Sequence, residues 1–116
     1  MSDTLIDHEA WETMKSMTDP AFLVELIDMY LTDSPQLIEQ IKAGLVNGDI
    51  ESVRRAAHSL KSNSLTFGAN RLGNAARELE MIAKAGTLEG ANIKLAAVEM
   101  EYAQLGPFLV ELKNEC

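Results

Sequence analysis

Cysteine is almost absent from this chain of 116 residues, since Cys116, the last residue, is the only one. A single thiol cannot form an internal disulfide framework, and a chain without disulfides suits a reducing compartment. A domain of this length buries about two-thirds of the surface that its unfolded chain exposes, so it can build a core without covalent cross-links. We expect one domain over residues 1–116.

Long apolar runs are also lacking. No stretch reaches the roughly 18 apolar residues that a membrane-spanning helix needs. Residues 1–7 have neither the basic region nor the apolar run of a secretory signal. We therefore expect a cytoplasmic protein that does not associate with membranes.

Basic side chains are scarce overall, with 10 Lys and Arg against 18 Asp and Glu and a net charge of −8. This balance argues against nucleic acid as a partner, because binding to phosphates requires a basic surface. The charge is unevenly distributed. Residues 1–49 carry ten acidic and two basic side chains (−8), residues 50–85 carry three and six (+3), and residues 86–116 carry five and two (−3).

The positive middle segment contains His58. Its cations come from two consecutive helices, so we expect them to form a local patch that suits an anionic group or an acidic partner surface. Helix-dipole complementarity and chance are the alternative explanation of this segregation.

Apolar residues recur at intervals of three and four, which is the helical period, and strand-like alternation is rare. The sequence predicts an all-α chain with a short helix over 7–17. A helix begins at Asp19-Pro20, and Asp33-Ser34-Pro35 starts another that is almost continuous with it and ends at Asn47-Gly48. A fourth helix covers Ile50–Phe67, followed by Gly68, a residue suited to a left-handed turn.

Asn70 is expected to cap the next helix, which closes at Gly86. The last helix runs from about Leu88, with Gly106-Pro107 kinking or breaking it. Because the connections are short, we expect neighbouring helices to be antiparallel. The predicted architecture is an antiparallel up-and-down four-helix bundle, with the short N-terminal helix covering one end.

The helix over Ile50–Phe67 has a predicted buried stripe and a polar flank. At 100° per residue the stripe consists of Val53, Ala57, Leu60, Ser64 and Phe67. His58 lies well off the centre of this stripe. Five residues fall within roughly 60° of it around the helix axis: Arg54, Arg55, Lys61, Ser62 and Leu65.

This flank has the groups that a phosphoryl-accepting histidine needs. An imidazole with an ordinary pKa of about 6.5 offers a nucleophilic nitrogen at neutral pH. Lys61 can offset phosphoryl charge, Ser62 leaves room for a partner and offers a hydroxyl, and Leu65 gives an apolar anchor. The alternative is a solvated helix face whose histidine has no function.

The same residues resemble the histidine-containing phosphotransfer (HPt) domain family. Its pattern is His-x-Leu-Lys, then glycine or serine and further small residues, with a glycine ten positions after the histidine. The matching residues are His58, Leu60, Lys61, Ser62, Ser64 and Gly68, with Asp49, Ala57, Leu79 and Glu80 in familiar flanking positions. The resemblance spans about residues 7–112. Ser62 replaces the commoner glycine, and Asn63 stands where a small residue is usual.

The resemblance implies a phosphorelay carrier and not an enzyme. His58 would accept a phosphoryl group from a receiver-domain aspartate and pass it to another receiver aspartate. The partners would be response-regulator receiver domains and a hybrid sensor histidine kinase, and the receiver would supply the Mg²⁺. We expect no bound cofactor or metal in this chain, and a monomer.

The resemblance also suggests roles for further residues. A polar side chain twenty-two residues after the histidine often orients the imidazole in this family, and that residue is Glu80 here. Accepting from Nδ1–H, it would leave Nε2 free as the nucleophile; the alternative is a plain solvated glutamate. The flank of His58 and the cations of the next helix, independently of the resemblance, give an expected docking face of Arg54, Arg55, Leu65, Arg71 and Arg77.

Other functions have less support from the sequence. A helical adaptor that binds receivers or other signalling domains through the same face without accepting phosphate is the main alternative. His8-Glu9 does not continue to a second histidine, so the zinc-protease pattern fails. Ser59 and Ser64 lack a histidine–carboxylate arrangement that would indicate a hydrolase. No Glu-x-x-His pairs indicate a di-iron bundle.

Overall fold

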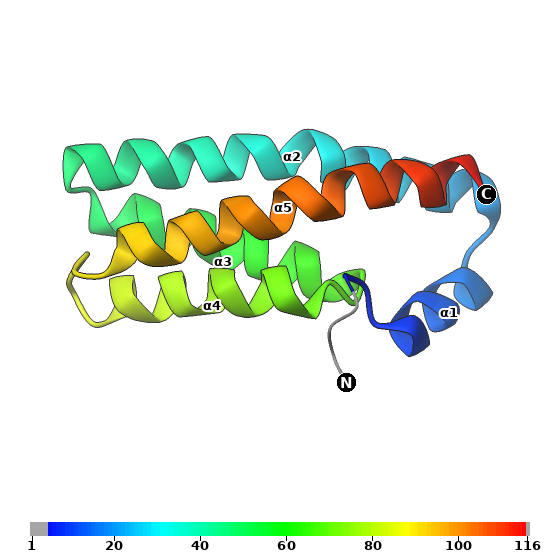
Figure 1. The fold of residues 1–116 in the computed structure, drawn as a ribbon, viewed down its shortest axis with the longest axis horizontal. Helices are drawn as coiled ribbons and strands as arrows, with labels where there is room; N and C mark the ends of the chain where they lie inside the picture. The colour runs from blue at the N-terminus through cyan, green and yellow to red at the C-terminus, as the bar shows by residue number, and fades with distance from the viewer. Residues whose placement is uncertain (1–4, 116) are drawn as a thin grey trace.

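Five α-helices make up most of the computed structural model, which describes residues 5–115 (Figure 1). They are α1 (His8–Met17), α2 (Pro20–Asn47), α3 (Ile50–Thr66), α4 (Asn70–Lys84) and α5 (Ala91–Asn114). Those residues contain no strand. The prediction of an all-α chain is confirmed.

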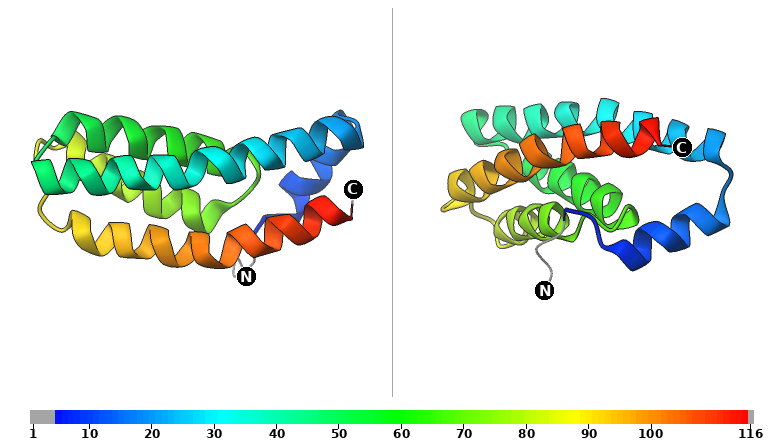
Figure 2. Two further views of the ribbon diagram at one scale, coloured as in Figure 1. Left: turned by 90° about the horizontal axis from the view of Figure 1, so that it is seen from above. Right: turned by 45° about the vertical axis from the view of Figure 1, so that its right-hand side comes forward.

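The four longer helices lie side by side, and α1 lies at one end of them (Figures 1 and 2). α3 packs against α2 and α4, and α5 packs against the same two helices. α3 and α5 are therefore diagonal to each other, with their outer faces on different sides of the molecule. α1 is anchored by Trp11, whose side chain is buried in the core.

Aspartates immediately precede and cap three of the helices. The carboxylate of Asp19 accepts a hydrogen bond from the backbone of Phe22, and that of Asp49 accepts one from Ser52. Asp7 does the same for Ala10 at the start of α1. Each bond satisfies an amide that has no partner within the first helical turn.

The chain passes through Pro35 as one continuous helix, so the possible restart at Asp33-Ser34-Pro35 does not interrupt α2. A proline inside a helix leaves the carbonyl four residues earlier without its helical partner. That carbonyl belongs to Leu31, and the hydroxyl of Tyr102 on α5 donates to it at 3.4 Å. A tertiary hydrogen bond thus compensates for the one that Pro35 removes.

Two predicted helix starts are wrong, one by a single residue and the other by three. Asn70 is not a cap but the first residue of α4, and its preceding residue, Ala69, makes no side-chain capping bond. The last helix begins at Ala91 and not near Leu88, because Gly90 takes a left-handed conformation (φ 81°). It then continues through Pro107.

Gly68 sits at the turn between α3 and α4, where two constraints coincide. Its φ of 77° lies in the left-handed region, which residues other than glycine rarely adopt. A Cβ there would also lie only 2.7 Å from the Cβ of Ala10 on α1. Its carbonyl accepts from the backbone of Asp7 at 2.7 Å. The glycine therefore lets α1 dock against the end of the helix that carries His58.

Candidate functional site

His58 projects from the middle of α3 with 54% of its side chain exposed. The face of this helix that points away from His58 holds it in place. All five residues of the predicted stripe on that face are buried: Val53, Ala57, Leu60, Ser64 and Phe67. The hydroxyl of Ser64 pairs with that of Tyr30 on α2 at 2.6 Å, and burial raises the pKa of Tyr30 to about 12. The imidazole thus stands on a rigid, fully packed segment.

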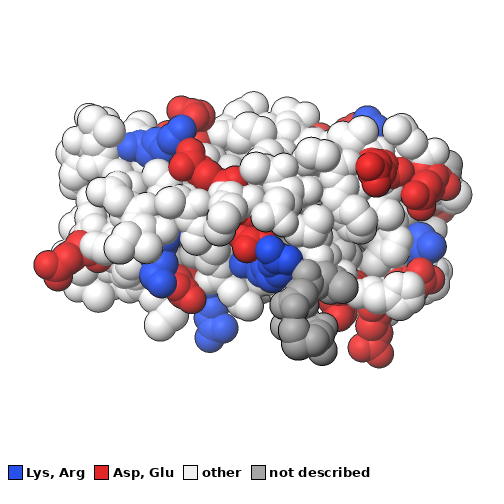
Figure 3. Space-filling view, in the orientation of Figure 1, with Lys and Arg blue, Asp and Glu red and all other residues white. Residues whose placement is uncertain are grey.

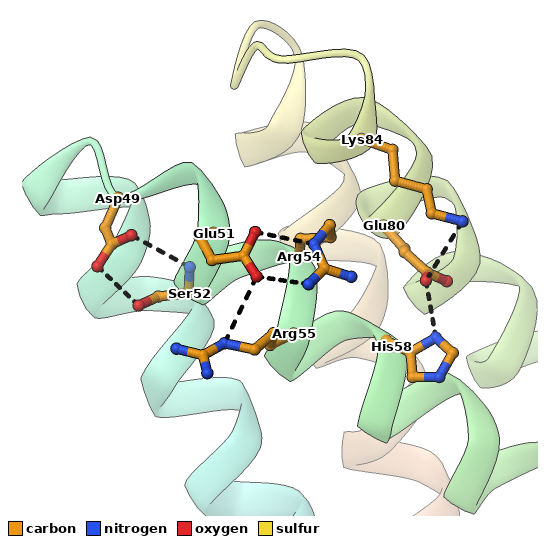
Figure 4. Close-up of polar contacts among 8 residues, drawn as sticks. All are labelled: Asp49, Glu51, Ser52, Arg54, Arg55, His58, Glu80 and Lys84. Carbon is orange, nitrogen blue, oxygen red and sulfur yellow. Dashed lines mark hydrogen bonds and ion pairs between the residues drawn. The ribbon is translucent and has the colours of Figure 1, made fainter.

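Glu80 on α4 reaches the imidazole from the neighbouring helix (Figure 4). Its Oε2 lies 2.7 Å from Nδ1 of His58, and its Oε1 lies 2.8 Å from Nζ of Lys61. Only 3% of Glu80 is exposed. A buried carboxylate is costly unless it is paired, and here two groups of α3 pair with it.

These partners keep Glu80 ionised. Burial acts to raise the pKa of Glu80, but the hydrogen bonds from Lys61 and His58 outweigh it, so the net pKa is lowered from its usual range. An ionised carboxylate can only accept hydrogen bonds, so the proton of a neutral imidazole resides on Nδ1. Nε2 then carries the free electron pair.

Lys61 and Lys84 both approach this carboxylate, but differently. Lys61 is largely covered, with 23% of its side chain exposed, and makes a close ion pair. Lys84 stands one turn beyond Glu80 on α4, is 62% exposed, and has its Nζ 4.0 Å from Oε2 (Figure 4). Lys84 was not among the predicted site residues. Its spacing of four from Glu80 is the signal that could have found it.

The remaining residues of the predicted flank lie on the outer side of α3. Ser62 is exposed, as expected for a position that leaves access open. Arg54 and Arg55 both form ion pairs with Glu51, one turn earlier (Figure 4). Leu65 is 42% exposed and lies against Gly73 of α4, where any Cβ would come within 2.6 Å of it.

The two arginines of α4 differ in direction. Arg77 is exposed, one turn before Glu80. Arg71 forms an ion pair with Glu101 of α5 at 3.0 Å, so its guanidinium lies toward α5 and not toward the flank of His58. The structure therefore does not bring Arg71 together with the other residues of the expected docking face.

The other histidine has a different environment. His8 is 85% exposed on α1 and has only an acidic neighbour within its own helix, Glu12, at 4.0 Å. Within residues 5–115 no group of three or more His, Cys, Asp and Glu side chains is placed to hold a metal ion. The same residues include no helix of sufficient length and apolarity to span a bilayer.

Comparison with known proteins gives consistent matches. The model of the Hpt domain family matches residues 25–107. Histidine-containing phosphotransfer protein 5 of Arabidopsis thaliana is 29% identical over 98 residues, which cover 82% of this chain and 62% of that protein. The chain therefore spans about three-fifths of the length of that relative.

Solved structures show the same fold. The crystal structure of histidine-containing phosphotransfer protein B from Pseudomonas aeruginosa superposes with a TM-score of 0.92 at 26% identity, covering 99% of each chain. A rice structure described as a histidine-containing phosphotransfer protein gives a TM-score of 0.82 at 21% identity, with 98% of this chain and 85% of that chain covered.

Proposed function

The chain belongs to the Hpt domain family, and from that premise we propose that it is a phosphorelay intermediate of two-component signal transduction, with His58 as the carrier of the phosphoryl group. Members of the family are phosphocarriers and not enzymes. The observation that supports His58 most is its geometry: an exposed imidazole whose Nδ1 is held by a buried carboxylate.

The proposed transfer proceeds at Nε2. Its electron pair attacks the phosphorus of an aspartyl phosphate, the P–Nε2 bond forms, the P–O bond to the aspartate breaks, and the receiver's carboxylate leaves. Nδ1 keeps its proton, so the phosphorylated ring is cationic, and Glu80 stabilises that charge. The reverse sequence hands the group to a second aspartate.

The surrounding residues have supporting roles in this proposal. Lys61 offsets the negative charge of the phosphoryl group, and Ser62 leaves space for the receiver. Arg54, Arg55, Leu65 and Arg77 form the docking face around them. The receiver domain supplies Mg²⁺ and an acidic pocket, so this chain needs no cofactor. A hybrid sensor histidine kinase and response regulators, in the cytoplasm, are the proposed partners.

The whole-chain architecture fits the proposal. We interpret α2–α5 as an antiparallel up-and-down bundle with α1 covering one end. In this arrangement a single domain presents one histidine on a rigid side wall, which a receiver domain can approach from solvent.

Incubation with a phosphorylated receiver and Mg²⁺ tests the function directly. Label on the wild type should be acid-labile and base-stable, which indicates a phosphohistidine. It should be absent from His58→Gln and retained in His8→Gln, the matched control at the more exposed histidine. A wild type that binds receivers but takes no label would support the adaptor alternative instead.

A further inference from the structure

The ammonium group of Lys61 already has a partner in the unphosphorylated protein. Its Nζ lies 2.8 Å from Oε1 of Glu80, and only 23% of the lysine side chain is exposed. The proposed function, however, assigns this ammonium group to the phosphoryl group on His58. A cation that balances a buried carboxylate cannot fully balance a second anion as well. Lys61 must therefore loosen its bond to Glu80 before it can take that role.

Glu80 differs from acidic residues that form ion pairs at the surface. It is the one buried charged residue in the described part of the chain. Glu78, which pairs with Lys94, is 51% exposed, and Figure 3 shows several basic side chains next to acidic ones over α4 and α5. Glu99, which pairs with Lys42, is 42% exposed. Water can replace a partner at such positions, whereas a buried carboxylate is stable only with a partner from the protein.

Phosphorylation changes the charges on both sides of Lys61. The neutral imidazole carries its proton on Nδ1, and bonding of phosphorus to Nε2 makes the ring a cation, 2.7 Å from Oε2 of Glu80. The phosphoryl group brings about two negative charges. It lies on the helix that carries Lys61, three residues before it, where side chains are neighbours. A cation is thus added beside Glu80 and an anion beside Lys61.

We propose that Lys61 exchanges partners when His58 is phosphorylated: its ammonium group leaves Glu80 and binds the phosphoryl group, and the cationic imidazole becomes the partner of Glu80. This inference rests on the proposed function and deepens it. The buried carboxylate keeps a cationic partner in both states, first at Nζ and then at Nδ1. Lysine suits the exchange because its ammonium group has three donors on a flexible four-carbon stem.

Other cations near the buried carboxylate are less well placed for the phosphoryl group. Arg54 is held by Glu51, whose Oε1 lies 3.0 Å from its Nε. Lys84 approaches the carboxylate from the side opposite the imidazole, and the second ring nitrogen points away from it (Figure 4). Lys61, by contrast, follows the histidine by one turn of the same helix.

The exchange would keep the resting site from trapping free anions. Before transfer, the charge of Lys61 is balanced by Glu80, so a free phosphate ion would have to compete with a buried carboxylate. After transfer, the cationic ring balances Glu80 instead, and the ammonium group is released beside a phosphoryl group that is covalently bound. The site gains a free cation only together with the group that it carries.

A double-mutant cycle in two states tests the exchange. Lys61→Met keeps the apolar stem, Glu80→Gln keeps the shape of the carboxylate, and urea unfolding of the four proteins at neutral pH gives their coupling. Potassium phosphoramidate loads His58 without a receiver: Nε2 attacks the phosphorus, the P–N bond of the reagent breaks, and ammonia leaves. Mass spectrometry measures the phosphorylated fraction.

The coupling should depend on the state of His58. In the unphosphorylated protein we expect it to change the unfolding equilibrium constant about tenfold, as for other contacting residues. In the phosphorylated protein it should fall below about twofold, the level of a weak surface pair. A Lys61–Glu80 coupling that is small already in the unphosphorylated protein, or that phosphorylation leaves unchanged, would overturn the exchange.

The cycle of Lys84→Met with Glu80→Gln is the matched control. Lys84 is 62% exposed and 4.0 Å from the same carboxylate, so its coupling should stay below about twofold in both states. An equal loss of coupling in both cycles would indicate a general effect of the added charge and would also overturn the exchange. Lys61→Gln, a polar replacement, provides the same cycle if Lys61→Met does not fold.

The two phosphoryl donors separate this inference from the proposed function. Loading by phosphoramidate but by no phosphorylated receiver would overturn the phosphorelay, and the coupling of Lys61 to Glu80 would still decide the exchange. Loading by both donors with an unchanged coupling would overturn the exchange and leave the phosphorelay in place. A protein that neither donor can load overturns both.

Discussion

Oε2 of Glu80 lies 2.7 Å from Nδ1 of His58, although the two residues are twenty-two positions apart on separate helices. The other carboxylate oxygen is occupied by Lys61. A single buried side chain thus fixes both the imidazole and the nearest ammonium group. The orientation and the tautomer of the histidine are therefore determined by the packing of α3 on α4 and not by solvent.

The charge of Glu80 is expected to matter for transfer. Glu80→Gln keeps the shape and can still accept from Nδ1–H, but it no longer stabilises a cationic phosphorylated ring. We expect single-turnover transfer from a receiver to slow about tenfold, equivalent to roughly 1.4 kcal/mol. Glu78→Gln, on the same helix at an exposed ion pair, is the matched control and should transfer normally. Equal rates in all three proteins would remove the electrostatic role of Glu80.

Acidification should remove the stability that Glu80 provides. Burial acts to raise the pKa of Glu80, but the hydrogen bonds from Lys61 and His58 lower it by more, so the net pKa is below the usual value. The unfolded chain therefore binds this proton more readily, so the stabilisation is complete above about pH 5 and is lost as pH falls through the lowered pKa.

Urea unfolding of the wild type and Glu80→Gln from pH 7 to pH 3 measures this effect. The difference in unfolding free energy should be about 1–2 kcal/mol near pH 7 and should shrink toward pH 3. The other carboxylates titrate in both proteins, so the difference isolates position 80. A difference that grows on acidification would mean that Glu80 is protonated in the folded state.

The two lysines near Glu80 should not be equivalent. Lys61→Ala removes the close, largely buried partner, and we expect slower transfer together with a lower midpoint of thermal unfolding. Lys84→Ala removes an exposed group 4.0 Å away, and we expect little change in either measurement. If Lys84→Ala slows transfer as much as Lys61→Ala does, Lys84 belongs to the site and not to its border.

The sequence was sufficient for the features that depend on local periodicity. The stripe from Val53 to Phe67 follows from the 3.6-residue repeat, and all its members are buried. The caps at Asp19 and Asp49 follow from their side-chain chemistry and position. The helical angle of His58 places it off the buried stripe, so its exposure was predictable as well.

Features that depend on contacts between distant residues were not predictable in this way. The hydroxyl of Tyr102 satisfies the backbone next to Pro35 from another helix, and local rules for proline do not include such a donor. The pairing of Arg71 with Glu101 likewise depends on how α4 and α5 pack. Arg71 was predicted to lie in the docking face because it is a cation on the helix that follows the one carrying His58, and position in the chain does not indicate which neighbour attracts the side chain.

Gly68 is expected to be more sensitive to substitution than another glycine of similar conformation. Gly68→Ala introduces a side chain at φ 77° and within 2.7 Å of Ala10, whereas Gly86→Ala, at φ 85°, meets nothing within 4 Å. We expect Gly86→Ala to cost about 1 kcal/mol through backbone strain alone and Gly68→Ala at least twice that. Chemical denaturation measures both. Equal costs would show that the contact with α1 contributes nothing.

The hydroxyl of Tyr102 should stabilise the protein only while Pro35 is present. Tyr102→Phe leaves the Leu31 carbonyl unsatisfied, and we expect a loss of about 1 kcal/mol. Pro35→Ala restores the backbone N–H that bonds this carbonyl within α2, so Tyr102→Phe should cost clearly less in that background. A double-mutant cycle of unfolding free energies measures the coupling. If the free-energy costs of the two substitutions are additive, the hydroxyl of Tyr102 does not compensate for Pro35. The continuity of α2 would then depend on another interaction.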